Sequence, residues 1–155
     1  MKRRSLLLAF AAASLGEVVS PPPAGADGEE IAVIVHKANP LPSMNRAQLS
    51  AIFRAKSTQF PSGGHASAVN LPQESAVRQA FDYAVLGLKP EEVERYWLDS
   101  KIRSGVGSPR KLPGPAAVVH FVGSDESAIG YVSRRDAGES VRVVARIRGG
   151  QVVGP

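Results

Sequence analysis

Apolar and polar residues alternate along the chain in two kinds of pattern. One kind is a short apolar run rich in β-branched residues, which is typical of strands. Residues 31–35 (Ile-Ala-Val-Ile-Val) form the clearest such run, and the absence of polar positions within it indicates a strand buried on both faces. We expect a sheet built from residues 31–36, 66–71, 129–132 and 141–147.

The other kind of pattern places apolar residues at the three- and four-residue spacing of an amphipathic helix. Residues 76–86 carry such a stripe, and similar segments start near residues 45, 90 and 115. Strands separated by helices indicate an α/β fold. We therefore expect a single three-layer lobe, in which a mixed sheet has helices on both faces.

The expected helices carry start and stop signals. Asn45 is followed three residues later by Gln48, which predicts a capping box at a helix start. Gly87 is placed to end the helix over residues 76–86, because glycine adopts the left-handed conformation of a helix terminus at little cost. Pro90 suits the first position of the next helix.

Aromatic residues in that next helix follow its apolar stripe. Val93, Tyr96 and Trp97 fall on one face, so we expect Tyr96 and Trp97 to belong to the core and not to a ligand platform. Residues 103–115 are rich in Gly, Ser and Pro and predict a loop.

The first residues have the three parts of a secretory signal peptide. A basic start (Lys2-Arg3-Arg4) precedes an apolar stretch over residues 6–15 and an Ala-Gly-Ala site at residues 24–26. The apolar stretch is shorter than the ~20 residues that span a bilayer. We therefore expect cleavage after Ala26, a mature domain over residues 27–155 without membrane insertion, and a periplasmic or secreted location.

Charge and composition narrow the functional classes. Losing the signal would remove three basic residues and one acidic residue, which lowers the formal net charge from +5 to +3. The chain lacks the basic stripe with interleaved aromatic residues that would indicate nucleic-acid binding. The chain has no cysteine, so disulfides and thiolate chemistry are excluded.

Candidate catalytic and metal-binding groups do not form a recognisable set. His36, His65 and His120 lack the spacing of a metal site, and no serine lies in the G-x-S-x-G frame of a nucleophile elbow. We expect no enzyme, no metal and no cofactor.

Three stretches, taken in order, resemble a known family. They are "IAVIVHKANPLPSMNRAQLSAIFRAKSTQFPSG" from residue 31, "AVRQAF" from residue 76 and "AIGYV" from residue 128. Their order and spacing resemble the second lobe of phosphate-type periplasmic substrate-binding proteins, and the chain is most similar to the short, single-lobe forms labelled phosphate transporter substrate-binding-like. The resemblance implies a periplasmic binding protein-like fold and a small anion as ligand, while the other lobe, which supplies half of the ligands in full-length proteins, has no counterpart here.

The resemblance also points to a ligand loop. In the family this loop carries an arginine ahead of a Ser-Gly-Thr helix start, whereas this chain has Ser75-Ala76-Val77, with Asn70 near the place of the arginine and Arg78 after it. If an anion binds, we expect it at this helix start, contacted by the Ser75 hydroxyl and the N–H groups of Ala76 and Val77. Arg78 and Asn70 are expected as further ligands, partly in place of the missing arginine. The alternative is that Ser75 only caps its helix.

Two functions remain open. The preferred one is an exported, non-enzymatic phosphate- or anion-binding-like protein with a degenerate ligand loop, whose site another copy or another protein could complete. The alternative is a protein-interaction or sensory module that has lost its small ligand. Five C-terminal arginines either form an anion-binding or docking surface or protect an edge strand by their charge, and we favour the edge strand; they are Arg134, Arg135, Arg142, Arg146 and Arg148.

Overall fold

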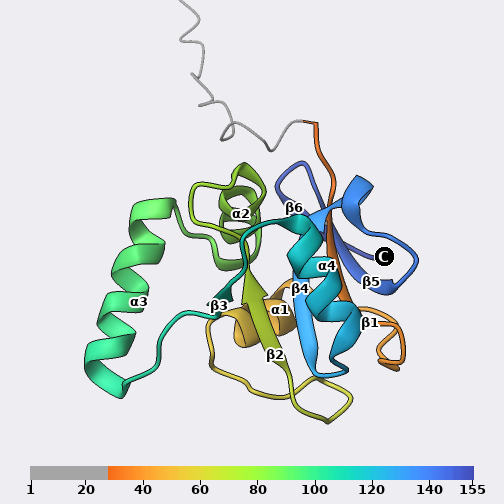
Figure 1. Cartoon of the computed structure of the whole chain (residues 1–155). Helices are drawn as coiled ribbons and strands as arrows, with labels where there is room; N and C mark the ends of the chain where they lie inside the picture. Colours follow the sequence, from red (N-terminus) through yellow and green to blue (C-terminus); the bar gives the residue numbers. More distant parts are fainter. Residues whose placement is uncertain (1–27) are drawn as a thin grey trace, which may run out of the picture.

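The strand β1 (Ile31–His36) lies inside a six-stranded sheet with the order β3-β2-β4-β1-β5-β6. The computed structural model describes residues 28–155, so the predicted signal peptide lies outside the described residues (Figure 1). Five of the six residues of β1 are buried, as its unbroken apolar run predicted. The other strands are β2 (Ser67–Asn70), β3 (Arg110–Lys111), β4 (Ala128–Ser133), β5 (Val141–Arg148) and β6 (Gln151–Val153).

The sheet is mixed, which confirms the expected α/β architecture. β1 pairs antiparallel with both β4 and β5, whereas β2 pairs parallel with β4 and with β3. β5 and β6 form an antiparallel hairpin through Gly149 and Gly150, both of which have positive φ angles. The four strands predicted from sequence are present, while the short edge strands β3 and β6 were not predicted.

Helices cover both faces of the sheet, and two neighbouring residues of β4 show this directly. Successive residues of a strand point to opposite faces. A Cβ placed on Gly130 would meet Val118 and Val122 of α4 (Pro115–Ser124), so α4 covers one face. Tyr131 packs instead against Phe53 of α1 (Arg46–Phe53) and Phe81 of α2 (Ala76–Phe81), so these helices cover the other. The three-layer prediction is confirmed.

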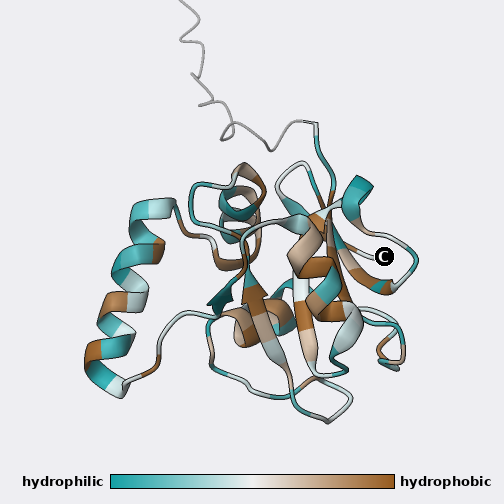
Figure 2. Cartoon of the chain, viewed as in Figure 1, coloured by the Kyte–Doolittle hydropathy of each residue, from teal (hydrophilic) through white to brown (hydrophobic). Residues whose placement is uncertain are grey.

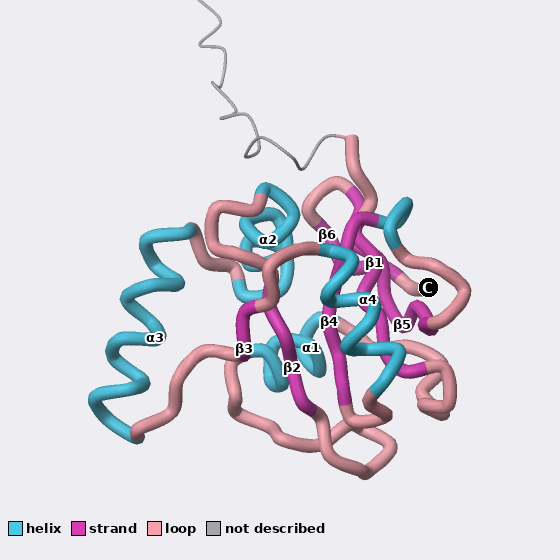
Figure 3. The backbone as a smooth tube through the Cα atoms, in the orientation of Figure 1, coloured by secondary structure: helices cyan, strands magenta, loops and turns pink. Residues whose placement is uncertain are grey.

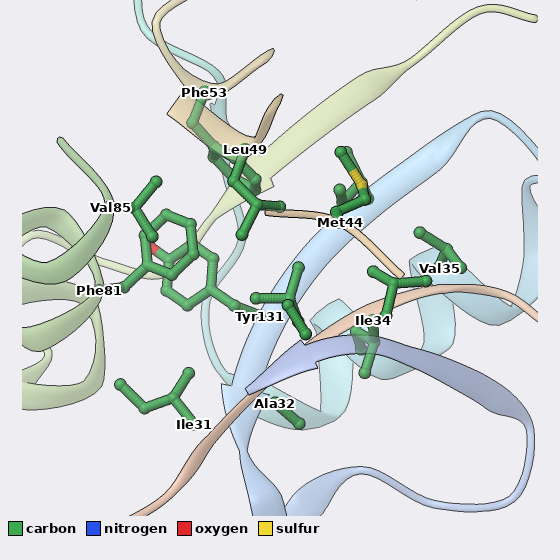
Figure 4. Close-up of a cluster of buried hydrophobic side chains, with 14 of the residues drawn as sticks. Ile31, Ala32, Ile34, Val35, Met44, Leu49, Phe53, Phe81, Val85 and Tyr131 are labelled. Atoms are coloured by element: carbon green, nitrogen blue, oxygen red, sulfur yellow. The ribbon is translucent and has the colours of Figure 1, made fainter. Parts of the chain in front are cut away.

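The centre of the core is an aromatic cluster between the sheet and α1 and α2. The Phe81 and Tyr131 rings are stacked, with centroids 3.8 Å apart, and Phe53 meets Phe81 edge-on at 4.7 Å. All three side chains are buried beside apolar residues of β1 such as Ile31 (Figure 4). The cluster joins segments that are distant in sequence, so it fixes α2 over the sheet.

The helix boundaries follow the predicted signals. Asn45 and Gln48 form the expected reciprocal capping box at the start of α1. The predicted helix over residues 76–86 consists of two parts, because α2 continues into a π-helical turn, η1 (Asp82–Leu86), which Gly87 ends in the left-handed conformation. Figure 3 colours all helical segments, α2 among them, in the same way. Among residues 28–155, no helix combines the length and the apolar character needed to cross a bilayer.

The prediction for α3 (Pro90–Ser104) was wrong in one respect. Val93 is buried, but Tyr96 and Trp97 are only half-buried and contact each other edge-on. The reason is that α3 stands beside the three layers and does not lie on the sheet, so it has little surface to pack against (Figure 1). The loop predicted over residues 103–115 also differs in part, because it contains the end of α3 and the short strand β3.

The interpretation of the C-terminal arginines as a protected edge is likewise wrong. β5 lies between β1 and β6, so it is not an edge strand. Arg146 and Arg148 both pair with Glu30, which lowers the pKa of that carboxyl, and Arg142 donates to the carbonyl oxygen of Asn39. These three guanidinium groups tie β5 to the two ends of β1.

Candidate functional site

The segment from Asn70 to Arg78 joins the carboxyl end of β2 to α2. Because β2 and β4 are parallel, this segment lies at the same end of the sheet as the end of β4. Carboxyl ends of parallel strands followed by helix starts are the usual place for ligands in open α/β sheets. The structure therefore places all five residues predicted from sequence in one segment at a suitable edge.

Ser75 caps α2. Its Oγ accepts a hydrogen bond from the N–H of Arg78 at 3.3 Å, and its own N–H donates to the carbonyl oxygen of Pro72. Ala76 is exposed and Val77 half-buried, and the hydrogen bonds found among residues 28–155 take up neither of their N–H groups. The sequence-based alternative, that Ser75 acts as a cap, is thus visible in the geometry, and two N–H groups remain directed outward from the helix start.

Arg78 lies inside the protein. Only 3% of the residue is exposed, its Nη1 donates to the carbonyl oxygen of Leu71 at 3.0 Å, and its Nε faces Asp82 Oδ2 at 3.4 Å. The guanidinium therefore fastens the start of the loop to the beginning of η1. In this conformation it does not reach out over the helix start.

Asn70 is also directed inward. Its Oδ1 accepts a hydrogen bond from the hydroxyl of Tyr131 at 3.0 Å, and both residues are buried. Burial raises the pKa of the Tyr131 phenol well above its ordinary value, so the hydroxyl keeps the proton that it donates. Asn70 and Arg78 thus hold the two ends of the segment in place.

Sequence reasoning missed Asp82 and Tyr131, which complete this buried polar network. Burial raises the pKa of Asp82 to about 6, while the ion pair and hydrogen bond with Arg78 act in the opposite direction. The spacing of Arg78 and Asp82, four residues apart in a helical stretch, was an available signal for a pair on one face. No comparable signal linked Tyr131 to Asn70, because the two residues are far apart in sequence.

Two surface cavities lie away from this segment. The first, of about 480 Å³, is lined by Arg46, by Tyr83 and Ala84 of η1, by Gly87 and by the β5–β6 hairpin. The second, of about 420 Å³, is lined by residues 38–40, the loop of residues 60–65 and Glu126, at the opposite end of the sheet from Ser75. Within residues 28–155, no group of three or more His, Asp or Glu side chains is arranged to hold a metal ion.

Comparison with solved structures identifies the fold. The chain matches an ABC-type phosphate transport receptor from Vibrio cholerae with a TM-score of 0.61 and 21% identity, covering 75% of this chain and 45% of the receptor. It matches a Clostridium perfringens protein assigned as a phosphate ABC transporter substrate-binding protein, with bound phosphate, at a TM-score of 0.61 and 28% identity, covering 75% and 44% of the two chains. PstS from Borrelia burgdorferi matches at a TM-score of 0.57 and 12% identity, with 75% and 46% covered.

Sequence comparisons add nothing to this result, since neither a protein-family model nor a curated protein matches the chain. The chain spans a little under half the length of the phosphate-binding proteins that it matches. In structure the chain is therefore similar to part of the substrate-binding proteins of phosphate ABC transporters, over one periplasmic binding protein-like lobe.

Proposed function

We propose that the protein is an exported, non-enzymatic binding protein of the phosphate-binding type, which takes a small anion at the start of α2. The observation that carries the proposal is the position of Ser75. It begins a helix directly after the carboxyl end of β2, in a lobe that matches a solved structure with bound phosphate. Outward N–H groups at a helix start attract anions through their partial positive charge.

In this proposal the five residues of the segment have two roles. Ser75, Ala76 and Val77 contact the anion, through the hydroxyl and the two outward N–H groups. Arg78 and Asn70 keep the segment in shape through their buried contacts with Leu71, Asp82 and Tyr131. This division departs from the first expectation, in which Arg78 and Asn70 were themselves ligands.

The affinity of such a site is low. Each interaction with an exposed helix terminus contributes ~0.3–1 kcal/mol. Millimolar binding already requires about 4 kcal/mol. A monomer with this open site is therefore expected to bind phosphate no more tightly than the millimolar range, and tighter binding requires groups from another copy or another protein.

Calorimetry with phosphate and with sulfate, at low ionic strength, tests the proposal. We expect weak binding that Ser75→Ala reduces, whereas Ser62→Ala, at the opposite end of the sheet, leaves it unchanged. Binding by the monomer tighter than about 100 μM would contradict the affinity argument. Absence of binding at any anion concentration would contradict the proposal itself.

A second function rests on a different observation. The Ser75 hydroxyl and the Arg78 guanidinium are both engaged within the chain, and α3 exposes apolar side chains. A protein-interaction or sensory module without a small ligand would have these properties. A protein that binds no anion but forms a stable complex with another protein would favour this function.

Export is proposed on the signal-like pattern of residues 1–26. The expected product is a chain that begins at Asp27 and carries one domain over residues 27–155. Mass spectrometry of the protein from a periplasmic or secreted fraction would show this N-terminus. A mature protein that keeps Met1–Arg4 would contradict it.

A further inference from the structure

The cavity of about 480 Å³ lies where the start of α1, the turn η1 and the β5–β6 hairpin meet. Its volume is within the range of about 300–1,000 Å³ that is usual for small-molecule sites. Among its lining residues, Ala84 is buried, Val152 packs against the core and Tyr83 is 44% exposed. The cavity thus lies at the margin of the apolar core, whose hydrophobic segments gather at the centre of the fold in Figure 2.

Arg46 is the only charged residue that lines this cavity. Its Nε donates to the carbonyl oxygen of Ala84 at 2.9 Å, and its Nη2 lies so close to Gly87 that a Cβ there would be 3.1 Å away. Among residues 28–155, no hydrogen bond or ion pair uses its Nη1 or Nη2. The guanidinium is therefore held in place through Nε, while the N–H groups of both Nη atoms remain available to a ligand.

The bond to Ala84 has a structural role of its own. The last carbonyl groups of a helix lack partners within the helix. At the end of η1, Arg46 donates to the carbonyl oxygen of Ala84 and Arg54 donates to that of Leu86. This capping occupies a single N–H group of Arg46, so it does not account for the rest of the guanidinium.

The charge of Arg46 has no counter-charge at the cavity. Arg46 is the first residue of α1, where the helix dipole disfavours a cation, and the first turn of α1 contains no acidic residue. None of the lining residues is acidic. The cavity is therefore electrostatically suited to an anion.

We propose that this cavity binds a small organic carboxylate, whose two oxygens accept hydrogen bonds from the Nη groups of Arg46. The planar guanidinium matches a carboxylate in such a paired geometry. The apolar part of the ligand lies against Tyr83, Ala84 and Val152. An inorganic anion would leave most of the 480 Å³ to water, since one water takes up ~30 Å³, so the cavity suits a carboxylate that carries an apolar body.

Titration of the purified protein with phenylacetate, followed by two-dimensional amide NMR spectroscopy, tests the proposal. Phenylacetamide keeps the ring and removes the charge, whereas acetate keeps the charge and removes the ring. We expect saturable shifts of the amide signals of Gly87, Gly150 and Val152, with a Kd for phenylacetate of about 1–10 mM. Phenylacetamide and acetate should each bind at least about fivefold more weakly.

Two arginine variants separate ligand binding from capping. Arg46→Gln should weaken phenylacetate binding at least about fivefold and leave the binding of phenylacetamide unchanged. Arg54→Gln removes the other arginine that caps η1, but Arg54 does not line the cavity, so this variant should bind phenylacetate like the wild type. Equal losses of affinity in the two variants would show that Arg46 only caps η1 and would overturn the proposal.

The comparison of the probes on the wild-type protein decides the proposal even if a variant does not fold. Equal affinities for phenylacetate and phenylacetamide would overturn it, as would the absence of saturable shifts at Gly87, Gly150 and Val152. The inference does not rest on anion binding at the start of α2. Ser75→Ala should therefore leave the affinity for phenylacetate unchanged, and a loss in this variant would assign the carboxylate to the start of α2 and not to the cavity.

Discussion

Arg78 and Asp82 form an ion pair almost entirely withdrawn from water, with 3.4 Å between Nε of Arg78 and Oδ2 of Asp82. Removing charges from water costs several kcal/mol for each ion, and the mutual attraction offsets this only where the geometry is good. Here the separation is long for a charge-assisted hydrogen bond. The result is that burial outweighs Arg78 and raises the pKa of Asp82 to about 6.

This pKa predicts a dependence of stability on pH. A carboxyl whose pKa is higher in the folded than in the unfolded state stabilises the fold when it is protonated, so its contribution is full below the ordinary value of 3.8 and is lost as pH rises through about 6. Between pH 7.5 and pH 5 the free energy of unfolding should therefore gain on the order of 1 kcal/mol from Asp82. Urea denaturation at several pH values measures it.

The matched variant is Asp82→Asn, which cannot titrate. Subtracting its pH profile from that of the wild type removes the contributions of the histidines and of all other carboxyl groups. The free energy of unfolding of the wild type, minus that of Asp82→Asn, should increase as pH falls toward 5. A difference that moves the other way would mean that Arg78 outweighs burial and lowers the pKa of Asp82.

Gly130 is predicted to be the least replaceable residue of β4. A Cβ at this position would lie 2.8 Å from Val118 Cγ1 and 3.0 Å from Val69 Cγ2, so α4 could not keep its place on the sheet. Overpacking of this kind costs about 1–3 kcal/mol. Gly130→Ala should lower the free energy of unfolding by that amount in urea denaturation.

Gly123 of α4 offers the control. A Cβ there would meet Ser140 only at 3.7 Å, which is an ordinary contact. Gly123→Ala should therefore be neutral or stabilise the helix by up to about 1 kcal/mol. Equal losses of stability for Gly130→Ala and Gly123→Ala would show that the close approach of α4 to Gly130 does not determine the cost of the substitution.

Tyr131 is predicted to stabilise the fold through its hydroxyl as well as its ring. Tyr131→Phe keeps the stacking on Phe81 but leaves Asn70 Oδ1 buried without its hydrogen-bond donor. Such a loss costs about 1–3 kcal/mol. The free energy of unfolding should fall by this amount, with an unchanged m-value.

Tyr83, which is 44% exposed, allows the same chemical change at a surface position. Tyr83→Phe should alter stability by less than about 0.5 kcal/mol. If both changes are neutral, the bond between Tyr131 and Asn70 does not contribute to the fold.

The sequence predicted those parts of the fold that depend on local signals. The apolar run of β1, the capping box of Asn45 and Gln48 and the terminal Gly87 are each determined by neighbouring residues, and each is confirmed. The failures concern long-range packing. Whether Trp97 is buried depends on what α3 meets, and a helical stripe indicates which side is apolar but not whether another element covers it.

The candidate site shows the same limit. Its segment could be located from the resemblance and from the helix start at Ser75. The direction of the Arg78 side chain could not, because it depends on Leu71, Asp82 and the aromatic cluster beneath α2. The same local sequence is compatible with a buried arginine and with one that points outward. Only the surrounding charges and carbonyl groups determine which of the two occurs.

Glu74 is predicted to weaken anion binding at the start of α2. It is exposed and directly precedes Ser75, so its negative charge lies beside the proposed position of the anion. Exposed charges at this range interact by ~0.2–1 kcal/mol, and salt screens them within about 10 Å at 0.1 M. Glu74→Gln should therefore strengthen phosphate binding about two- to fivefold at low ionic strength, and the gain should shrink as salt is added.

Glu126→Gln removes the same charge at the opposite end of the sheet and should leave the affinity unchanged. If titration calorimetry finds equal affinities for Glu74→Gln and the wild type, and Ser75→Ala changes only stability, the segment from Asn70 to Arg78 is a structural connection and the anion site is wrong.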